Sequence, residues 1–319
     1  MKFPPRLSRS DFPSVLAIVG PTCSGKTDLS LRAARESAGE VVSADSRQVY
    51  RGMDIGTGKP GRRDLGEVRH HFIDILNPDE EYNAGRYGVE ARRTVLSVLD
   101  GGKTPIIVGG SGLYIQAVID GFFEGPARDP EIRDRLDQLL RTRGGDGLWE
   151  KLREVDPSSA KNIHPTQTRR LTRALEVLMA TGKPISQWHA EQSREPLFNV
   201  RQIGIRWERA ELYGRINERC ERMMRDGLLG ETEALKAKGY DGKLNSMNSV
   251  GYREALRHLE GKISRDEMLD EFKRNSRRFA KRQLTWFRAD ERITWLDAGG
   301  EGWLDNVWHQ LRKAGNIVR

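Results

Sequence analysis

The segment from Gly20 to Thr27 has the residue types and the spacing of a phosphate-binding loop. It fits the pattern G-x-x-x-x-G-K-[ST]. Glycines allow the backbone to curl so that successive N–H groups point at one anion, while Lys26 adds a positive charge and the Thr27 hydroxyl is suited to Mg²⁺. We therefore expect a phosphate or diphosphate to be held by Gly20, Pro21, Thr22, Cys23, Ser24, Gly25, Lys26 and Thr27.

A second candidate, Asp45, follows directly after the strand-like run at 40–44. A carboxylate there is suited to three roles: holding Mg²⁺, acting as a general base, or capping the N-terminus of a following helix. The presence of a phosphate loop does not decide which of these three roles Asp45 has. Nucleoside triphosphate hydrolysis, phosphoryl transfer and departure of a diphosphate leaving group all use the same loop.

The elements around these residues predict a parallel sheet. Apolar runs at 15–19, 40–44 and 105–109 have the length of buried strands, and helical patterns begin at Lys26 and cover 85–99. Strands that alternate with helices form parallel sheets. Ligands of open α/β sheets collect at the carboxyl ends of the strands, so Asp45 is expected to face the phosphate loop.

The pattern changes between Asp129 and about Gln192, where apolar residues recur at helical spacing and no strand-like run is found. Strand patterns then return at 200–207 and 292–296, with long helical patterns at 210–238 and 266–287 between them. The predicted fold is α/β, a P-loop NTPase-like parallel sheet flanked by helices, with an inserted helical subdomain. Its parts are the first half of the catalytic core at 14–128, the insert at 129–197, and the second half of the core at 198–319.

The charge of the chain favours an anionic partner. Lys and Arg total 54 against 46 Asp and Glu, which gives a formal net charge of +8. The apolar fraction of 37% is low but distributed in periodic segments, so a folded chain is expected rather than a disordered one. Nucleic acid and a phosphate-rich small molecule both satisfy this charge.

The cysteines and the N-terminus bear on the compartment. Cys23 and Cys220 are too few for a disulfide framework and lie in no metal-binding motif. The segment Met1–Asp11 is basic but lacks an apolar stretch, and the run at 15–19 is too short to span a bilayer. The expected protein is cytoplasmic, without membrane contact.

A basic stripe marks the helical pattern at 266–287. Its cations recur at spacings of three and four, with no acidic residue between Phe272 and Ala289, and Phe279 and Trp286 are expected on the opposite, packed side together with Phe272. The stripe either faces solvent or lies along RNA, and the density of like charge favours RNA. Its members are Lys273, Arg274, Arg277, Arg278, Lys281, Arg282 and Arg288.

The amino-acid sequence of several segments resembles that of the tRNA dimethylallyltransferase (isopentenyltransferase) family, in its bacterial type without a C-terminal zinc finger. The longest match is Asp45-Ser-Arg-Gln-Val-Tyr-Arg-Gly-Met-Asp-Ile-Gly-Thr-Gly-Lys-Pro60. Further matches are His70-His-Phe-Ile-Asp74, Gly109-Gly-Ser-Gly-Leu-Tyr114, Arg170-Leu-Thr-Arg-Ala-Leu-Glu-Val177, Val250-Gly-Tyr-Arg253 and Lys281-Arg-Gln-Leu-Thr-Trp-Phe-Arg288. The resemblance covers the chain from about Leu16 to Leu296.

The resemblance implies a reaction: a dimethylallyl group passes from dimethylallyl diphosphate to the exocyclic N6 amine of the adenine next to the anticodon (position 37), and diphosphate is released. The phosphate loop then holds the diphosphate, with Thr27 on its Mg²⁺, and Asp45 matches the family's base. Ser111 stands where the family usually has Thr and retains the hydroxyl. Arg219 matches an arginine that contacts the diphosphate, although Arg215 and Arg222 lie close in sequence.

The resemblance also implies where the tRNA anticodon stem-loop lies, with the target adenine flipped out of its stack into a channel. The positions that match tRNA-contacting segments, together with the basic stripe, are Asp45, Ser46, Arg47, Gln48, Arg133, Gln167, Thr168, Arg169, Arg170, Arg277, Lys281 and Arg282. A monomer is expected.

Three other functions remain open on the residues alone: prenylation of free adenine nucleotides, a P-loop nucleotide kinase, and an RNA-binding ATPase without transfer chemistry. The helical insert and the basic stripe are not needed for the first of these. The long match at 45–60 argues against the other two. His70 and His71 are adjacent rather than four apart, so hydrogen-bonding or loop roles are favoured over metal binding.

Overall fold

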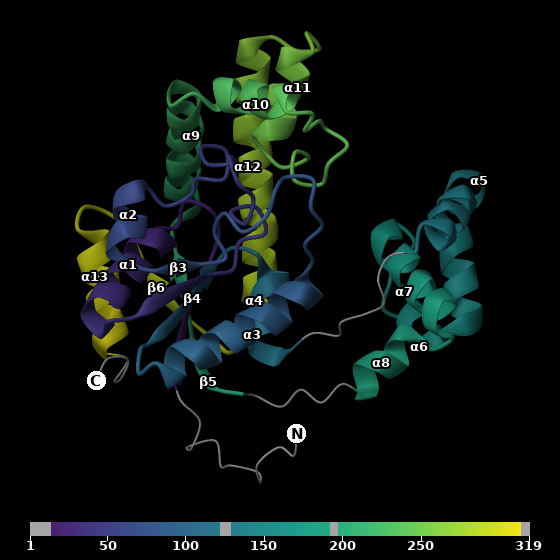
Figure 1. Ribbon diagram of the computed structural model, residues 1–319, viewed down its shortest axis with the longest axis horizontal. Coiled ribbons are helices and arrows are strands. Elements are labelled where there is room, and N and C mark those ends of the chain that lie inside the picture. The colour runs from purple at the N-terminus through teal and green to yellow at the C-terminus, as the bar shows by residue number, and fades with distance from the viewer. Residues whose placement is uncertain (1–13, 122–128, 192–196, 314–319) are drawn as a thin grey trace. The chain divides into compact units, whose positions relative to one another are not determined.

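The computed structural model describes residues 14–121, 129–191 and 197–313. The chain divides into two compact units, one formed by residues 1–120 with 196–319 and the other by 121–195 (Figure 1). The predicted domain boundaries fall in or beside 122–128 and 192–196, and the N-terminal segment Met1–Asp11 also lies outside the described residues. The predicted domain limits therefore remain predictions.

The larger unit is built on a six-stranded sheet in the order β3-β2-β4-β1-β5-β6, in which every neighbouring pair is parallel. Five strands confirm the apolar runs predicted from the sequence. The sixth, β3, has only two residues and was not predicted. The strands are β1 (Ser14–Val19), β2 (Glu40–Ser43), β3 (His70–His71), β4 (Pro105–Gly109), β5 (Asn199–Arg206) and β6 (Ile293–Asp297).

The position of β1 explains why the site forms where it does. From β1 the chain first builds β2, β3 and β4 on one side, and later β5 and β6 on the other. The strand order thus reverses at β1, and ligands of open α/β sheets bind outside the carboxyl ends of the strands at such a point. The phosphate loop leaves the carboxyl end of β1. The predicted P-loop-type α/β fold is confirmed.

Helices cover both faces of this sheet. Figure 1 shows α1 and α13 on one face and α3 and α4 on the other, while α9, α10 and α11 gather beyond the carboxyl ends of the strands and α12 runs from them down to α4. Amphipathic patterns account for most of them, since each of these buries one apolar stripe, whereas α2 has no buried residue. The bounds are α1 (Lys26–Ser37), α2 (Arg62–Glu67), α3 (Ala84–Asp100), α4 (Gly112–Asp120), α9 (Arg209–Arg225), α10 (Leu228–Ala237), α11 (Tyr252–Leu259), α12 (Arg265–Arg288) and α13 (Trp303–Lys313).

One predicted helix is wrong. The pattern at 210–238 forms two helices, α9 and α10, because Gly227 between them has φ 104°, a left-handed conformation that ends α9 and begins α10. The apolar spacing continues across the break because both helices bury a face. Periodicity therefore does not reveal the turn at Gly227.

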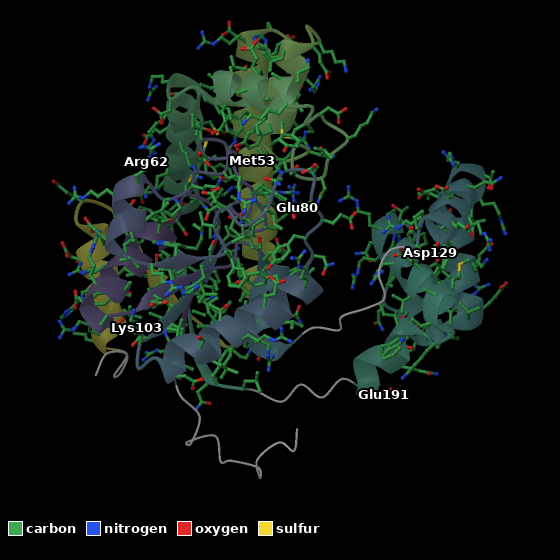
Figure 2. The ribbon with its side chains drawn as sticks, viewed as in Figure 1. Met53, Arg62, Glu80, Lys103, Asp129 and Glu191 are labelled. Carbon is green, nitrogen blue, oxygen red and sulfur yellow. The ribbon has the colours of Figure 1, made fainter. Side chains whose placement is uncertain are left out.

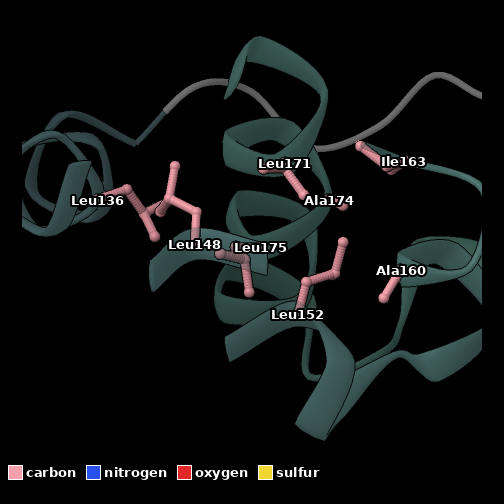
Figure 3. Packing of buried hydrophobic residues seen from close by; sticks show 8 residues of the cluster. All are labelled: Leu136, Leu148, Leu152, Ala160, Ile163, Leu171, Ala174 and Leu175. Atoms are coloured by element: carbon pink, nitrogen blue, oxygen red, sulfur yellow. The ribbon is translucent and has the colours of Figure 1, made fainter. Parts of the chain in front are cut away.

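The smaller unit is helical, as predicted, and has its own core. Its helices are α5 (Pro130–Val155), α6 (Pro157–Ala160), α7 (Thr168–Thr181) and α8 (Ile185–Glu191). Figure 3 shows side chains from α5, α6 and α7 meeting in one cluster. Gly144, at φ 64°, interrupts α5 and lets its second half turn back onto α7. The cluster is Leu136, Leu148, Leu152, Ala160, Ile163, Leu171, Ala174 and Leu175.

The amino ends of the strands carry a polar cluster that explains the two histidines. His71 Nε2 lies 2.7 Å from Glu40 Oε2, and Lys103, labelled in Figure 2, donates to Glu40 Oε1 at 2.6 Å. His70 Nδ1 lies 2.7 Å from the Val68 carbonyl. The predicted hydrogen-bonding role of these histidines is confirmed. Of the helices that the structure describes, none combines the length and apolar character of a membrane span.

Candidate active site

The phosphate loop joins β1 to α1 through backbone conformations that few residues adopt. Gly20 has φ 145°, Cys23 φ 65° and Gly25 φ 84°, and Gly25 is the N-cap of α1. A Cβ atom at Gly25 would fall 2.1 Å from Cη2 of Trp303, so no larger residue fits there. The loop therefore depends on glycine for both its curvature and its packing.

Several donors of the loop are left for a ligand. The Thr22 amide donates to Gln283 and the Ser24 amide to the Pro21 carbonyl, but those of Gly25, Lys26 and Thr27 donate to no residue that the structure describes. The Ser24 hydroxyl is buried and lacks a partner among the described residues. Unsatisfied amides at a helix N-terminus form an anion site, and a buried unpaired hydroxyl marks a position that a ligand completes.

Lys26 is held in the loop by a hydrogen bond from its Nζ to the Pro21 carbonyl at 2.5 Å. Burial, together with the positive charge of Arg219, lowers the pKa of Lys26 to about 8 against the opposing effects of Cys23 and Asp45. Near pH 8 a part of the Lys26 population is therefore neutral, and a bound anion favours the protonated form. The loop is therefore charged most strongly when it is occupied.

Arg219 on α9 reaches the loop from the side. Its Nη1 donates to Thr22 Oγ1 at 3.1 Å and lies 3.9 Å from Cys23 Sγ, and its Nη2 donates to the Thr57 carbonyl at 3.3 Å. Arg222 is exposed on the same helix and makes no contact with the loop. Among the three arginines considered from the sequence, Arg219 is the one whose guanidinium lies beside the loop side chains.

Arg215 contacts the loop from behind. Its Nε donates to the Cys23 carbonyl at 3.0 Å, and its guanidinium lies over the Trp207 ring at 4.1 Å. The Trp207 indole in turn donates to the Ser24 carbonyl at 3.0 Å. Holding the Ser24 carbonyl on one side turns the N–H group of the same peptide, that of Gly25, toward the other side, where the anion would lie.

Asp45 caps the turn that follows β2. Its Oδ1 accepts from the Arg47 amide at 2.8 Å and from the Gln48 amide at 3.4 Å, and no described residue donates to Oδ2. The capping role considered from the sequence thus applies to a turn rather than to a helix, and it engages one oxygen. The other oxygen remains able to take a proton.

Ser111 lies beside this turn because β2 and β4 are neighbours in the sheet. Its Oγ accepts from the Ser46 amide at 3.1 Å and lies 3.3 Å from Ser46 Oγ. The close approach requires a glycine, since a Cβ at Gly109 would fall 2.1 Å from the Ala44 carbonyl oxygen. The structure therefore brings together the turns that carry Asp45 and Ser111.

Gln283 is a site residue that sequence reasoning missed. Its Oε1 accepts from the Thr22 amide and its Nε2 donates to the Gly110 carbonyl, both at 2.9 Å. It is buried on α12 in line with Ser276, Ala280 and Phe287. A glutamine at a position expected to be apolar was the available signal, because a buried amide needs partners.

The segment at 45–60 is held mainly by hydrogen bonds among its own residues and with a residue of α10. Glu231 accepts from the amides of Asp54, Ile55 and Gly56 at 2.8 to 3.1 Å, and Lys59 donates to the Tyr50 carbonyl at 2.6 Å. Met53, labelled in Figure 2, is fully buried in this segment. The segment thus forms a rigid wall beside the phosphate loop.

Two side chains predicted to contact RNA are occupied within this wall. Gln48 Nε2 donates to the Gly58 carbonyl at 3.2 Å, and Arg47 Nη1 donates to the Asn245 carbonyl at 2.7 Å. Ser46 is engaged with Ser111. These hydrogen bonds fix the position of the segment. Contact of these side chains with RNA stays a prediction.

The smaller unit carries five of the other predicted RNA residues, Arg133, Gln167, Thr168, Arg169 and Arg170. Arg169 and Arg170 are exposed at the start of α7, where Thr168 is the first residue and Gln167 the N-cap. Gln167 Oε1 accepts from the His164 amide at 3.2 Å. Arg170 Nη1 also donates to Gln167 Oε1, at 3.4 Å, whereas Arg169 forms no hydrogen bond or ion pair with a described residue. The N-terminal turn of α7 thus presents two exposed cations, one of which is held by the N-cap side chain.

Arg133 is differently placed. Its Nε donates to Glu176 at 3.1 Å, and Arg173 donates to the same carboxylate at 2.9 Å. Burial alone would raise the pKa of Glu176, but the hydrogen bonds and charges of the two arginines outweigh it and hold the pKa below its ordinary value. Arg133 therefore has a structural partner within its own unit.

The basic stripe of α12 divides into bound and unbound cations. Lys273 donates to Glu221 at 2.6 Å, Arg277 donates to Asn217 at 2.6 Å, and Arg274 lies 3.7 Å from Glu271. The remaining four are exposed and form no ion pair with a described residue: Arg278, Lys281, Arg282 and Arg288. The expectation that Phe279 and Trp286 are packed is wrong, because both side chains are exposed.

The described residues build no metal cage. Nowhere in 14–121, 129–191 or 197–313 do three His, Cys, Asp or Glu side chains gather as metal ligands. Mg²⁺ in phosphate-transfer sites usually keeps several waters and is held by one or two protein oxygens plus the substrate's phosphates. The exposed Thr27 at the start of α1 offers one such oxygen. The residues fit a Mg²⁺ that is bound largely through the diphosphate.

Comparisons with known proteins agree along nearly the whole chain. The family model described as IPP transferase matches residues 48–290. The chain is 45% identical to a tRNA dimethylallyltransferase of Pelobacter propionicus, over 89% of this chain and 93% of that protein. It is also similar to the crystal structure of a full-length tRNA isopentenylpyrophosphate transferase from Bacillus halodurans, with 38% identity, a TM-score of 0.68, and coverage of 94% and 96% of the two chains.

A third match extends the likeness to eukaryotes. A eukaryotic dimethylallyltransferase whose structure was solved acting on tRNA shares 26% identity and a TM-score of 0.80 with this chain. The match covers 94% of this chain and 77% of the eukaryotic one. The phosphate loop, the ordered wall at 45–60 and the agreement with these proteins together identify the chain as a member of the tRNA dimethylallyltransferase family.

Proposed function

We propose that this protein transfers a dimethylallyl group from dimethylallyl diphosphate to the N6 amine of adenine 37, beside the anticodon, in certain tRNAs. A tRNA dimethylallyltransferase activity follows from the family membership. The observation that carries the finer proposal is the convergence of one free carboxylate oxygen, a hydroxyl and an incomplete anion site at the carboxyl ends of three neighbouring strands.

In this reaction the adenine nitrogen forms a bond to C1 of the dimethylallyl group while the bond between C1 and the diphosphate oxygen breaks. The electron pair of the broken bond leaves with the diphosphate. The nitrogen loses one proton, and Asp45 Oδ2, which no described residue occupies, is the proposed acceptor. The exocyclic amine is a weak nucleophile because its lone pair is delocalised, so removing its proton relieves a growing positive charge.

The leaving group is assigned to the phosphate loop. The free amides at the start of α1, the unpaired Ser24 hydroxyl, Lys26 and Arg219 would share the negative charge that develops on the diphosphate. Mg²⁺, when bound at Thr27, would supply further charge neutralisation. Ser111, held by the Ser46 amide, is proposed to orient the bridging oxygen.

The RNA is assigned to the cations that remain exposed. Lys281 and Arg282 on α12 and Arg169 at the start of α7 are exposed and form no ion pair with a described residue. Arg170 is exposed as well, although it donates to Gln167 Oε1 at 3.4 Å. Thr168 and Gln167 would support the α7 turn, and Arg277 and Arg133 would act mainly through the groups that they already bind. We propose that the protein acts as a monomer in the cytoplasm.

The test is a direct assay of the product. The purified protein is incubated with dimethylallyl diphosphate, Mg²⁺ and an anticodon stem-loop that carries adenine 37, and the digested nucleosides are analysed by mass spectrometry. We expect one dimethylallyl adenosine per stem-loop, and none when adenine 37 is replaced by guanine. Modification of free AMP without modification of the RNA would instead establish the free-nucleotide activity, and ATP turnover without RNA would favour a kinase or ATPase.

A further inference from the structure

Two exposed aromatic rings lie on the second half of α12, the half whose Gln283 contacts the phosphate loop and Gly110. Trp286 is 48% exposed and Phe279 is 38% exposed, and Leu113 on α4 is exposed as well. With Val155 of the smaller unit they are the exposed large apolar side chains of the described residues. Large apolar groups left in water beside a polar site mark a surface that a ligand covers.

The indole of Trp286 is held at a defined place. A Cβ atom at Gly112 would fall 2.2 Å from Cδ1 and 2.3 Å from Nε1 of Trp286, so one edge of the indole rests on the bare backbone of Gly112. Gly112 follows Ser111 in the chain. One turn earlier on α12, Gln283 donates to the Gly110 carbonyl. The ring is thus fixed beside the turn that carries Ser111, with nearly half of its surface free.

The cations next to the two rings are also free. Arg278 and Arg282 precede Trp286 by eight and four residues, so they lie on the same side of the helix. Both are exposed, neither forms an ion pair with a described residue, and the Arg282 guanidinium lies 5.7 Å from the centre of the Phe279 ring. The carboxylate-bound cations Lys273 and Arg274 belong to the first half of α12.

Alternating exposed aromatics and cations suit single-stranded nucleic acid. Its phosphates need positive charge, and its unpaired bases stack on flat rings irrespective of their sequence. We propose that Trp286 is a stacking platform for an unpaired loop base that neighbours the modified adenine, with Arg278 and Arg282 on the adjoining phosphates. This inference rests on the proposed function, because it takes the RNA substrate from there.

The neighbouring base is favoured over the target adenine by the geometry. The target must reach Asp45 and Ser111, whereas the half-exposed Trp286 indole rests on Gly112, one residue beyond Ser111. When an adenine leaves its stack, the bases on either side of it lose a stacking surface, and an enzyme that flips a base must offset that loss. The Trp286 indole supplies the missing surface.

The experiment compares two replacements of the indole. Trp286→Leu keeps an apolar side chain on Gly112 but removes the flat ring, and Trp286→Phe keeps a ring. We expect Trp286→Leu to weaken binding of the anticodon stem-loop about tenfold and Trp286→Phe to restore most of that loss. Since neither change removes a charge, the slope of log affinity against log salt stays that of the wild type. Arg278→Gln, the matched control, should reduce that slope by about 0.7.

Abasic RNA identifies the base. Stem-loops are prepared with one abasic nucleotide at each unpaired loop position in turn, and each is bound to the wild type and to Trp286→Leu. We expect the difference between the two proteins to disappear at one position beside adenine 37 and to persist elsewhere. Equal binding of intact RNA by both proteins, or a penalty that no abasic position removes, would overturn the proposal.

The proposed function is judged separately from the same samples. The wild type must modify the intact stem-loop, and its KM for dimethylallyl diphosphate must be unchanged in Trp286→Leu, because the indole is not assigned to the donor. A wild type that leaves RNA unmodified refutes the proposed function. A wild type that modifies RNA, alongside a Trp286→Leu protein with undiminished affinity, refutes only the stacking platform.

Discussion

Thr22 and Gln283 are separated by 261 positions in the chain, yet the Thr22 amide donates a 2.9 Å hydrogen bond to Gln283 Oε1. The other end of the same amide side chain donates to Gly110. One side chain therefore fixes the distance between the phosphate loop and the turn that carries Ser111. Because both ends of the Gln283 amide are engaged with backbone groups, its effect should be one of positioning.

Gln283→Leu tests this link. We expect the loss of both hydrogen bonds to raise the KM for dimethylallyl diphosphate and to lower kcat, each by about tenfold, since misplacement of reacting groups by a fraction of an ångström slows a reaction strongly. Affinity for the RNA stem-loop should stay within about twofold. Steady-state kinetics with each substrate varied separately measures the split. Unchanged kcat and KM for the donor would show that the link is not needed.

Asp45→Asn separates the two roles of this carboxylate. The asparagine oxygen retains the cap on the Arg47 amide, which Asp45 provides now at 2.8 Å, but the amide cannot accept a proton. We expect kcat to fall by about a hundredfold or more with little change in RNA affinity or thermal stability. Single-turnover assays and RNA titrations measure both. A variant that keeps normal kcat would remove Asp45 as the base.

Binding of dimethylallyl diphosphate should take up a proton near pH 8. Burial and Arg219 lower the pKa of Lys26 to about 8, and the diphosphate's negative charge raises it again, so part of the Lys26 population is protonated on binding. Donor affinity should therefore fall as the pH rises from 7 to 9. Calorimetry at pH 8.5 in buffers of different ionisation enthalpy measures the proton count, and Lys26→Met should abolish it.

The same group has a defined effect on the stability of the free protein. The unfolded chain keeps Lys26 protonated up to its ordinary pKa of 10.5, whereas the folded protein releases that proton from about pH 8. The unfolded state thus binds more protons in this window, so the contribution of Lys26 to the free energy of unfolding rises with pH between about 8 and 10.5. The donor should remove this rise.

Glu176→Gln tests the ion cluster of the smaller unit. The pKa of Glu176 is held below its ordinary value of 4.5, so its stabilising contribution is present above that value and is lost as the pH falls through the lower folded pKa. We expect Glu176→Gln to lower the free energy of unfolding of this unit by about 2 kcal/mol at pH 7 and by less near pH 3. Unfolding monitored by hydrogen exchange at helix α7 would report it. An equal loss at both pH values would contradict the assignment.

Much of the fold follows from local pattern. The strands at 15–19, 40–44 and 105–109 are short runs with apolar centres that end at or close to a glycine, a loop or an acidic residue, and each forms where it was predicted. The strand β3 has only two residues, which are too few to show a periodic pattern of apolar side chains. The phosphate loop was predictable because its glycines, lysine and threonine meet requirements of the loop itself.

The site's cross-links were not predictable in the same way. Gln283 and Glu231 form hydrogen bonds with backbone groups that are distant in sequence. No sequence motif predicts that these two side chains link distant segments. The prediction that Trp286 is packed is wrong for a related reason. It follows Phe279 by seven residues, as Phe279 follows Phe272, so all three share one side of the helix. Spacing gives an angle about the helix axis, but only the fold decides whether that side is covered.

The contact between Gly25 and Trp303 has a consequence for how the protein is made. Gly25 leaves the ribosome early, whereas Trp303, whose ring lies against it and within 5.4 Å of Arg215, belongs to the last described helix. Trp207 and Arg215, which bind the Ser24 and Cys23 carbonyls, are made before Trp303. A nascent chain whose α13 is still in the exit tunnel therefore lacks the last aromatic ring that packs on the start of α1.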